Sequence, residues 1–311
     1  MEVILAIDGG ATRTRCVAID RAGRTLGDAE RGASNHLQRS AEAVRTTLTE
    51  AVDETLRMAN LGNGDVKCIS AGLAGVDYDG YGAAPMLALF RELGFECCLV
   101  QGDMVIAHAA ALGMRPGIVV LAGTGSATFG VDAGGRCVKV GGWGPVYGDE
   151  GSAQRISQQA MAAAARAYDG RGPATALLAA LTKDLGLSDF RESISVIYGP
   201  QARDVASLCR AVHRTAAAGD EVACSLFREA AEELAEAVIA AARQLDLTHS
   251  PVGVSYQGGV AENCPLLIEF LRKRLKHHLP LADFHPPRWK PVIGAYLLGC
   301  RSLGWDANAV C

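Results

Sequence analysis

Two glycine-rich turns constrain the fold of this chain more than any other feature of its sequence. Moving the sequence along itself by 112 positions (123 minus 11) aligns ATRTRCVAIDRAGR at 11–24 with GTGSATFGVDAGGR at 123–136. Each copy follows an apolar run and leads into another, which is the pattern of a strand–turn–strand hairpin. The repeat therefore predicts two related domains, each opening on such a hairpin.

The order of strand-like and helical runs predicts an α/β protein. Short apolar runs alternate with helical periodicity through the first third of the chain, which favours sheets flanked by helices. The 311 residues also exceed what one hydrophobic core usually covers. We expect a first α/β domain at 1–114 and a second α/β domain with extra helices at 115–290.

Helical spacing is clearest in six segments. The first runs over 35–59 and places Leu37, Val44, Leu48, Val52 and Leu56 on one apolar stripe. Four more are predicted in the second domain, at 150–168, 175–186, 201–220 and 221–245, and the last at 291–304.

Composition excludes several classes of function. The net charge is -4, so the chain has no general attraction for nucleic acid or anionic lipid. No apolar run approaches the 18 or so residues that cross a bilayer. The ten cysteines form no C-x-x-C pair, and we expect reduced core residues of a cytoplasmic protein. His277, His278 and His285 lack carboxylate or cysteine partners at ligand spacing, so surface roles are favoured over a metal site.

The two turns have a chemical interpretation besides the joining of strands. Glycine lets backbone N–H groups converge on one point and hydroxyls add donors, which suits phosphate. Neither turn is a Walker loop, and neither leads into a helix as a dinucleotide turn does. A matched pair favours a nucleotide clamp between domains over plain hairpin joints. Its candidate residues are Gly9, Gly10, Thr12, Thr124, Gly125 and Ser126.

Two aspartates follow apolar strands. Asp8 ends the first strand, where it either holds Mg²⁺ through water beside the phosphates or caps the turn. Asp103 follows the run CCLVQG and precedes a helix. It is either the N-cap of that helix or a base at the carboxyl end of a strand, where open α/β sheets bind ligands.

Two further loops carry candidate binding residues. In GGWGPVYGDEGSA (141–153) glycines surround Trp143, which leaves a flat apolar face that suits a sugar ring, with carboxylates nearby. The alternative is a core tryptophan followed by a helix cap at Asp149 and Glu150. In QGGVAENCP (257–265) the paired glycines Gly258 and Gly259 allow a flat adenine or ribose to approach the backbone.

Together the motifs DGGATRT, SNH, GTGS and GGWGPVYGDEGSA resemble the N-acetylglucosamine kinases and the related BadF-type ATPases, over nearly the whole chain. The resemblance implies a two-domain actin-like (ribonuclease H-like) ATPase fold, with duplicated mixed sheets, a nucleotide cleft between them and a last helix at 291–311 that completes the first domain. It implies an ATP- and Mg²⁺-dependent kinase, a transferase of amino sugar metabolism that phosphorylates the 6-hydroxyl of N-acetylglucosamine or glucosamine. A bacterial, cytoplasmic homodimer is expected.

The resemblance also implies roles for individual residues. Thr12 and Thr124 would bind the phosphates, Gly258, Gly259 and Asn263 would lie by the adenosine, and Asp103 would be the catalytic base. The sugar would contact Asn35, Asp103, Gly125, Ser126, Gly142, Trp143, Gly144 and Asp149. Two positions depart from the mammalian enzymes, which carry Glu at Asp8 and Asn at Ala127; Asp at the first is common in bacterial members.

Two other functions are compatible with parts of the sequence. BadF-type relatives include ATPases that activate a partner enzyme through an iron–sulfur cluster, but the adjacent Cys97 and Cys98 and the isolated Cys137 suit core packing better. A sugar-sensing repressor would need a DNA-binding segment before the first turn, where only seven residues precede Asp8.

Overall fold

The computed structural model describes residues 1–199 and 204–306, and these fall into two compact units. Unit 1 contains residues 1–119, 131–137 and 286–311, and unit 2 contains 120–130 and 138–285. The start of the helix predicted over 201–220, the end of the segment 291–311 and Cys311 lie outside the described residues.

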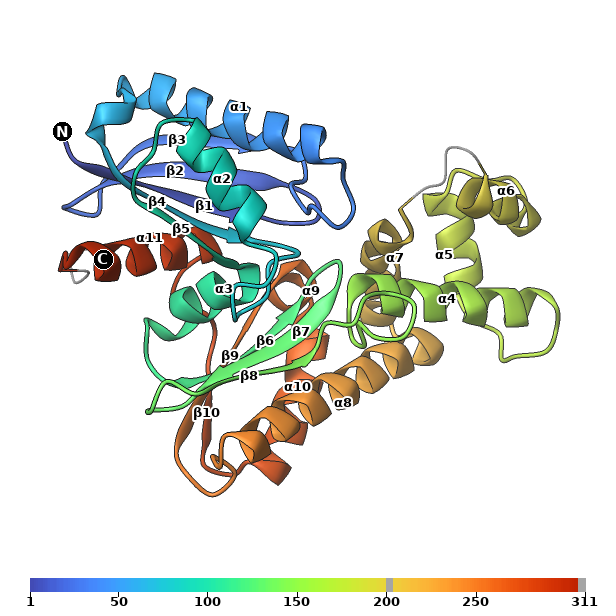
Figure 1. The fold of residues 1–311 in the computed structure, drawn as a ribbon. Helices are drawn as coiled ribbons and strands as arrows, with labels where there is room; N and C mark the ends of the chain where they lie inside the picture. The colour runs from blue at the N-terminus through green and yellow to red at the C-terminus, as the bar shows by residue number, and fades with distance from the viewer. Residues whose placement is uncertain (200–203, 307–311) are drawn as a thin grey trace. The chain divides into compact units, whose positions relative to one another are not determined.

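The sheet of unit 1 has the strand order β3-β2-β1-β4-β5 (Figure 1). β1 is antiparallel to β2 and parallel to β4, which is in turn parallel to β5. Buried aliphatic residues fill β1 and β2 because helices cover both faces of this sheet. The strands are β1 (Val3–Gly9), β2 (Thr14–Asp20), β3 (Thr25–Arg31), β4 (Val66–Leu73) and β5 (Cys98–Gly102).

Four helices pack on this sheet, two on each face. α1 (Ala41–Ala59) and α2 (Ala84–Glu92) share one core with it. α3 (Asp103–Leu112) and α11 (Pro291–Leu303) share the other, in which Tyr296 is fully buried and its hydroxyl donates to the Asp20 carbonyl at 2.9 Å. The last helix of the chain therefore belongs to the core of the first sheet.

α1 begins later than the sequence pattern predicted. Ser40 is its N-cap and accepts a hydrogen bond from the Ala43 N–H, so the residues before it are not helical. The predicted stripe is confirmed for Val44 and the three later residues, which are buried. It is wrong for Leu37, which is 73% exposed in the preceding loop.

The second sheet repeats the first. Its order is β10-β9-β6-β7-β8. Read from the opposite end, this is the order of the first sheet with each strand replaced by the one five places later. The predicted α/β fold with duplicated mixed sheets is thereby confirmed. Its strands are β6 (Gly117–Ala122), β7 (Ser126–Val131), β8 (Cys137–Gly141), β9 (Val252–Gln257) and β10 (Ala282–Phe284).

The repeat extends to hydrogen bonds at the second turn of each copy. Asp20 accepts N–H groups of the β2–β3 turn and the Nε–H of Arg24 at 2.8 Å. Asp132 does the same in the β7–β8 turn, where Arg136 donates its Nε–H at 3.1 Å. Identical residues 112 positions apart (132 minus 20) therefore fix the same turn twice.

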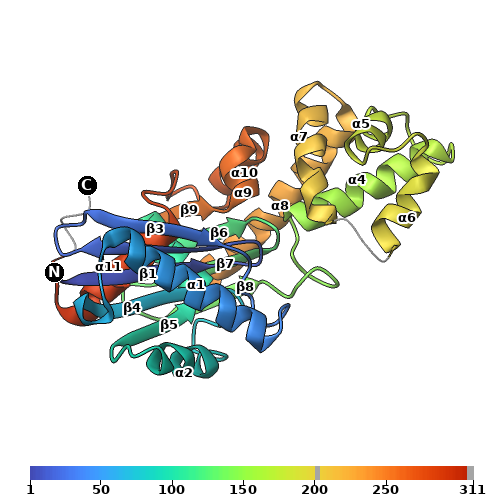
Figure 2. The ribbon, with the colours of Figure 1, turned by 90° about the horizontal axis from the view of Figure 1, so that it is seen from above.

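Unit 2 also carries the extra helices. Figure 2 shows α4 to α7 gathered into one helical group, from which α8 runs back along the second sheet. Two 3-10 turns, at Phe190–Glu192 and Val205–Leu208, belong to this group. The helices are α4 (Ala153–Tyr168), α5 (Leu177–Asp184), α6 (Ser193–Tyr198), α7 (Cys209–Ala217), α8 (Glu221–Gln244), α9 (Gly259–Asn263) and α10 (Pro265–His278).

Candidate active site

A first group of candidate residues lies at the carboxyl edge of the unit 1 sheet. Gly9, Leu73 and Gly102 are paired across β1, β4 and β5, so they form one row at the ends of three parallel strands. Asp103 follows the row directly, about two strand spacings, or roughly 10 Å, from the end of β1. The glycine turn after β1 and this carboxylate thus lie on one edge, where parallel sheets bind their ligands.

The turn after β1 is held on both sides. Within it the Gly10 N–H donates to the Arg13 carbonyl at 2.8 Å. From outside, the Ala74 N–H donates to the Gly9 carbonyl at 2.7 Å. Thr12 is exposed at the tip, and Asp8 is half-buried at the end of β1. The backbone of the turn is fixed by neighbours while its tip faces solvent.

Asp103 is the first residue of α3 and half-buried, and its Oδ1 accepts the N–H of Met104 at 2.8 Å. The alternative that it is the N-cap is wrong, because Gly102 holds that position without a side-chain bond. The helix dipole stabilises a carboxylate in the first helical turn. Because α3 begins directly after β5, this turn lies at the edge of the sheet.

Asn35 lies in the loop between β3 and α1 and is 8% exposed. Its Oδ1 accepts the Leu37 N–H at 3.0 Å. Gly75, with φ of +91°, lies so close that a Cβ there would be 2.9 Å from the same oxygen. The loop after β4 therefore fixes the Asn35 side chain by close contact.

A second group of candidate residues, in unit 2, lies at the turn between β6 and β7. The Gly123 N–H donates to the Gly125 carbonyl at 2.9 Å. The first turn of α4 bonds the same loop, since the Ala153 N–H donates to the Gly123 carbonyl at 2.9 Å. Thr124 lies between these two glycines. Its backbone is therefore positioned by the end of β6 and by the start of α4.

The paired glycines 258 and 259 lie against this turn. Gly258 has φ of +106°, and a Cβ there would be 2.6 Å from the Ala122 carbonyl oxygen. A Cβ at Gly123 would be 3.8 Å from the Gly259 nitrogen. Asn263 ends α9 and donates from Nδ2 to the Gly259 carbonyl at 2.8 Å. Two motifs far apart in sequence are thus neighbours.

Asp149 packs against the turn between β6 and β7. It is 8% exposed, has φ of +57°, and lies where a Cβ on Gly125 would be 2.8 Å from its Oδ2. Burial raises the pKa of its carboxyl above the usual value, although the N–H groups of Ser126 and Gly144 donate to it and act in the opposite direction. The predicted helix start at Asp149 and Glu150 is wrong, because Ser152 is the N-cap of α4.

We expect Asp149→Asn to leave the melting temperature at pH 7 no lower than that of the wild type. The raised pKa means that the folded state binds a proton here more tightly than the unfolded chain. The charged form therefore costs stability at neutral pH, and this cost disappears as the pH falls through the folded pKa. Asparagine also tolerates a positive φ.

The resemblance implies that Asp149 binds a sugar, and on that role catalytic efficiency should fall about 10-fold or more, because hydrogen bonds to a charged group contribute about 1.5–3 kcal/mol. Thermal melts between pH 4 and pH 8, with kinetics on the same samples, check both parts. A strongly destabilised variant at pH 7 would contradict the role of burial.

Trp143 is 67% exposed, so the alternative of a core tryptophan is wrong. It lies in a loop whose glycines 141, 142 and 144 all have positive φ, which a residue with a side chain rarely adopts. The glycine spacing therefore turns the backbone so that the indole stays uncovered.

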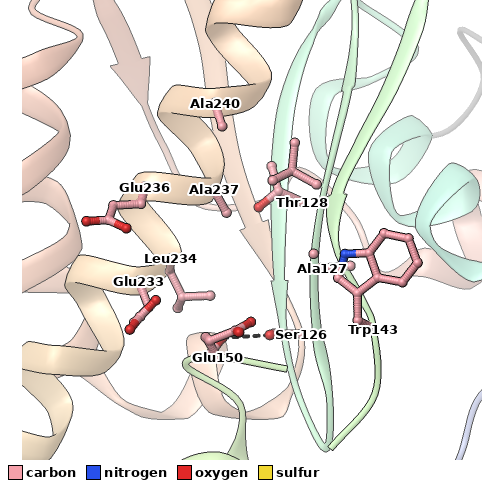
Figure 3. Close-up of a pocket in the computed structure, with 12 residues that line it drawn as sticks. Ser126, Ala127, Thr128, Trp143, Glu150, Glu233, Leu234, Glu236, Ala237 and Ala240 are labelled. Atoms are coloured by element: carbon pink, nitrogen blue, oxygen red, sulfur yellow. Dashed lines mark hydrogen bonds between the residues drawn. The ribbon is translucent and has the colours of Figure 1, made fainter. Parts of the chain in front are cut away.

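A cavity of about 320 Å³ lies between β7, β8 and α8, and Figure 3 shows side chains that line it. Ser126 and Trp143 belong to its lining, and Ser126 Oγ donates to the Glu150 carbonyl at 2.6 Å. Glu150, Glu233 and Glu236 make the lining acidic, and burial together with the neighbouring carboxylates raises the pKa of Glu233. The sequence did not reveal the two α8 glutamates, because α8 has the pattern of an ordinary amphipathic helix.

Within residues 1–199 and 204–306, no group of three or more His, Cys, Asp or Glu side chains could hold a metal ion. Mg²⁺ commonly binds one or two carboxylates and completes its shell with water and substrate phosphates. Asp8, at the end of β1 beside the glycine turn, fits that donor set. Across the same residues, the helices are too short or too polar to cross a bilayer.

Duplicated five-stranded sheets, each with a glycine turn after its first strand, define the actin-like ATPase fold that sugar kinases share. The chain belongs to the BadF/BadG/BcrA/BcrD ATPase family, whose model matches residues 5–299.

Three relatives support this assignment. The chain is 32% identical to an N-acetylmuramic acid/N-acetylglucosamine kinase of Clostridium acetobutylicum, over 96% of this chain and 98% of the relative. It is 27% identical to the N-acetyl-D-glucosamine kinase of Dictyostelium discoideum, over 97% and 98%. A solved Chromobacterium violaceum protein, provisionally assigned as an N-acetylglucosamine kinase, superposes with a TM-score of 0.79 at 27% identity, over 96% and 98%.

Proposed function

We propose that this protein is an ATP-dependent kinase that transfers the γ-phosphoryl group to the 6-hydroxyl of N-acetylglucosamine. The observation that carries the proposal is the placement of Asp103 on the sheet edge that also holds the glycine turn after β1. The relatives named above are kinases of N-acetylated amino sugars, which supports the substrate class. They also make a kinase the better choice over an ATPase that activates a partner enzyme.

We assign the residue roles to these two groups of candidate residues, one in each unit. The glycine turns present backbone N–H groups and the hydroxyls of Thr12 and Thr124 to the phosphates. Gly258, Gly259 and Asn263 bind the adenosine, since they adjoin the turn after β6. Asp8 would hold Mg²⁺ through water, and the bound ion would supply positive charge beside the phosphates. The sugar contacts Asn35, Asp103, Gly125, Ser126, Gly142, Trp143, Gly144 and Asp149.

Asp103 orients the 6-hydroxyl and accepts its proton as that oxygen bonds to the γ-phosphorus. The bond from phosphorus to the bridging oxygen breaks, and ADP leaves with its electron pair. Such transfer depends on positioning and on stabilisation of charge, and the protein does little covalent chemistry of its own.

We expect N-acetylglucosamine to give the highest kcat/KM in a panel with glucosamine, glucose and N-acetylmuramic acid. N-acetylmuramic acid should be the poorer of the two acetylated sugars, because its carboxylate is repelled by the acidic cavity beside Ser126 and Trp143. ADP release coupled to a spectrophotometric assay measures turnover, and phosphorus NMR of the product locates the phosphate.

The variant Glu233→Gln/Glu236→Gln should raise kcat/KM for N-acetylmuramic acid relative to N-acetylglucosamine. Glu221→Gln/Glu229→Gln, on the same helix and outside the cavity lining, is the matched control. No ADP formation with any amino sugar would refute the proposed kinase.

A further inference from the structure

Ser34 joins the phosphate turn to the loop after β3. It is 1% exposed. Its N–H donates to the Gly10 carbonyl at 3.2 Å, and its Oγ accepts the hydroxyl of Thr14 at 2.8 Å. A Cβ on Gly9 would be 2.4 Å from the same Oγ, so only glycine at position 9 lets the serine hydroxyl approach this closely. Ser34 thus contacts the turn at both of its ends.

The next residue is Asn35, which the proposed function assigns to the sugar. Its position is set from two directions. On one side Ser34 anchors it to the turn, and on the other the loop after β4 packs Gly75 against its Oδ1. That loop also reaches the turn, because the Ala74 N–H donates to the Gly9 carbonyl at 2.7 Å. The other two loops are therefore each hydrogen-bonded to the turn, and they pack against each other at Gly75 and Asn35.

We propose that Ser34 is a positioning residue that couples the phosphate turn to the sugar-binding Asn35, so that one side chain sets the relative placement of the two substrates. The inference rests on the proposed function. Ser34 itself touches neither substrate: it acts through Gly10 and Thr14 on one side and through the peptide bond to Asn35 on the other.

The physical reason is the sensitivity of phosphoryl transfer to placement. Removal of the Ser34 hydroxyl leaves one buried group, the Thr14 hydroxyl, without its acceptor, a loss that a folded protein tolerates. A displacement of about 1 Å between reacting groups can lower the rate up to roughly 10²-fold. Removal of the Ser34 hydroxyl should therefore affect activity far more than stability.

The test compares Ser34→Ala with Thr55→Val. Thr55 is equally buried in unit 1, and its hydroxyl donates to the carbonyls of Cys16 and Ala51, away from the turn. We expect similar small losses in melting temperature for both variants. Ser34→Ala should lower kcat/KM about 10-fold or more, whereas Thr55→Val should stay within about two-fold of the wild type.

The pattern of KM values separates positioning from simple destabilisation. Ser34→Ala should raise KM for both ATP and sugar, whereas Asn35→Ala should raise KM for the sugar alone. Thr14→Val should resemble Ser34→Ala, and the double variant should be little worse than either single one, because both remove the same hydrogen bond.

The outcomes distinguish this inference from the proposed function. An active wild type with a Ser34→Ala variant of normal kinetics would overturn the inference and leave the kinase intact. Equal kinetic losses in Ser34→Ala and Thr55→Val would also overturn it, since general loosening would then explain both. A wild type without sugar-dependent ADP formation would refute the kinase and the inference together.

Discussion

Asp103→Asn is expected to lower kcat by roughly 10²–10⁴-fold, the contribution of a well-placed general base. The amide has nearly the shape of the carboxylate but cannot accept the proton of the 6-hydroxyl. The fold should survive, because the amide oxygen can still accept the Met104 N–H that Asp103 Oδ1 accepts now. KM for ATP should change little.

The matched control is Asp53→Asn, which removes the same charge from an exposed position on α1. It should leave kcat within about two-fold of the wild type, since surface substitutions away from special features have small effects. Steady-state kinetics with circular dichroism on both variants decides the matter. Near-normal turnover in a folded Asp103→Asn protein would remove Asp103 from the mechanism.

Gly258→Ala should be the most damaging glycine substitution in the proposed nucleotide site. Its φ of +106° is strained for any residue with a side chain, and the new methyl group would lie 2.6 Å from the Ala122 carbonyl oxygen. Strain of this kind costs about 1–3 kcal/mol, and overpacking adds about as much. We expect the melting temperature to fall by roughly 5–10 °C and KM for ATP to rise at least about 10-fold, because the turn holding Thr124 must shift.

Gly259→Ala provides a comparison within the same motif. Nothing lies within 4 Å of a Cβ at this position, so the melting temperature should stay within about 2 °C of the wild type. If the adenosine lies here, the methyl group should raise KM for ATP and leave KM for the sugar unchanged. Differential scanning fluorimetry and two-substrate kinetics give both readings. Equal melting temperatures for the two variants would contradict the strain argument.

The duplicated sheets could be predicted because the repeated residues are those that fix the backbone conformation of each turn. Gly23 and Gly135 supply positive φ in matching turns, while Asp20 and Asp132 bond to the backbone within four residues. Such contacts depend on nearby sequence alone, so an alignment reveals them. The start of α1 was placed too early because helical periodicity continues through Leu37, whereas the helix begins only after its N-cap, Ser40.

The site was only partly visible in the sequence. Glycine and aspartate motifs predict where ligands bind, because their conformations and charges are distinctive. The residues that pack against these motifs could not be predicted from the sequence. Ser34 looks like any loop serine until β3 brings it against Gly10, and Glu233 looks like a solvated glutamate until α8 packs beside β7. Both depend on contacts between distant segments, which residue spacing does not encode.

The packing of α11 has a consequence for synthesis of the protein. This helix follows all of unit 2 in the chain, yet it fills the core beside β1 and β4, and a Cβ on Gly294 would be 1.9 Å from the Ile106 carbonyl oxygen of α3. This face of the first sheet is therefore covered only in part, by α3 without α11, until residues 291–303 leave the ribosome, although domains otherwise fold in order as they are made. Truncations or insertions that disturb α11 should thus harm unit 1, most of which precedes α11 by more than 170 residues.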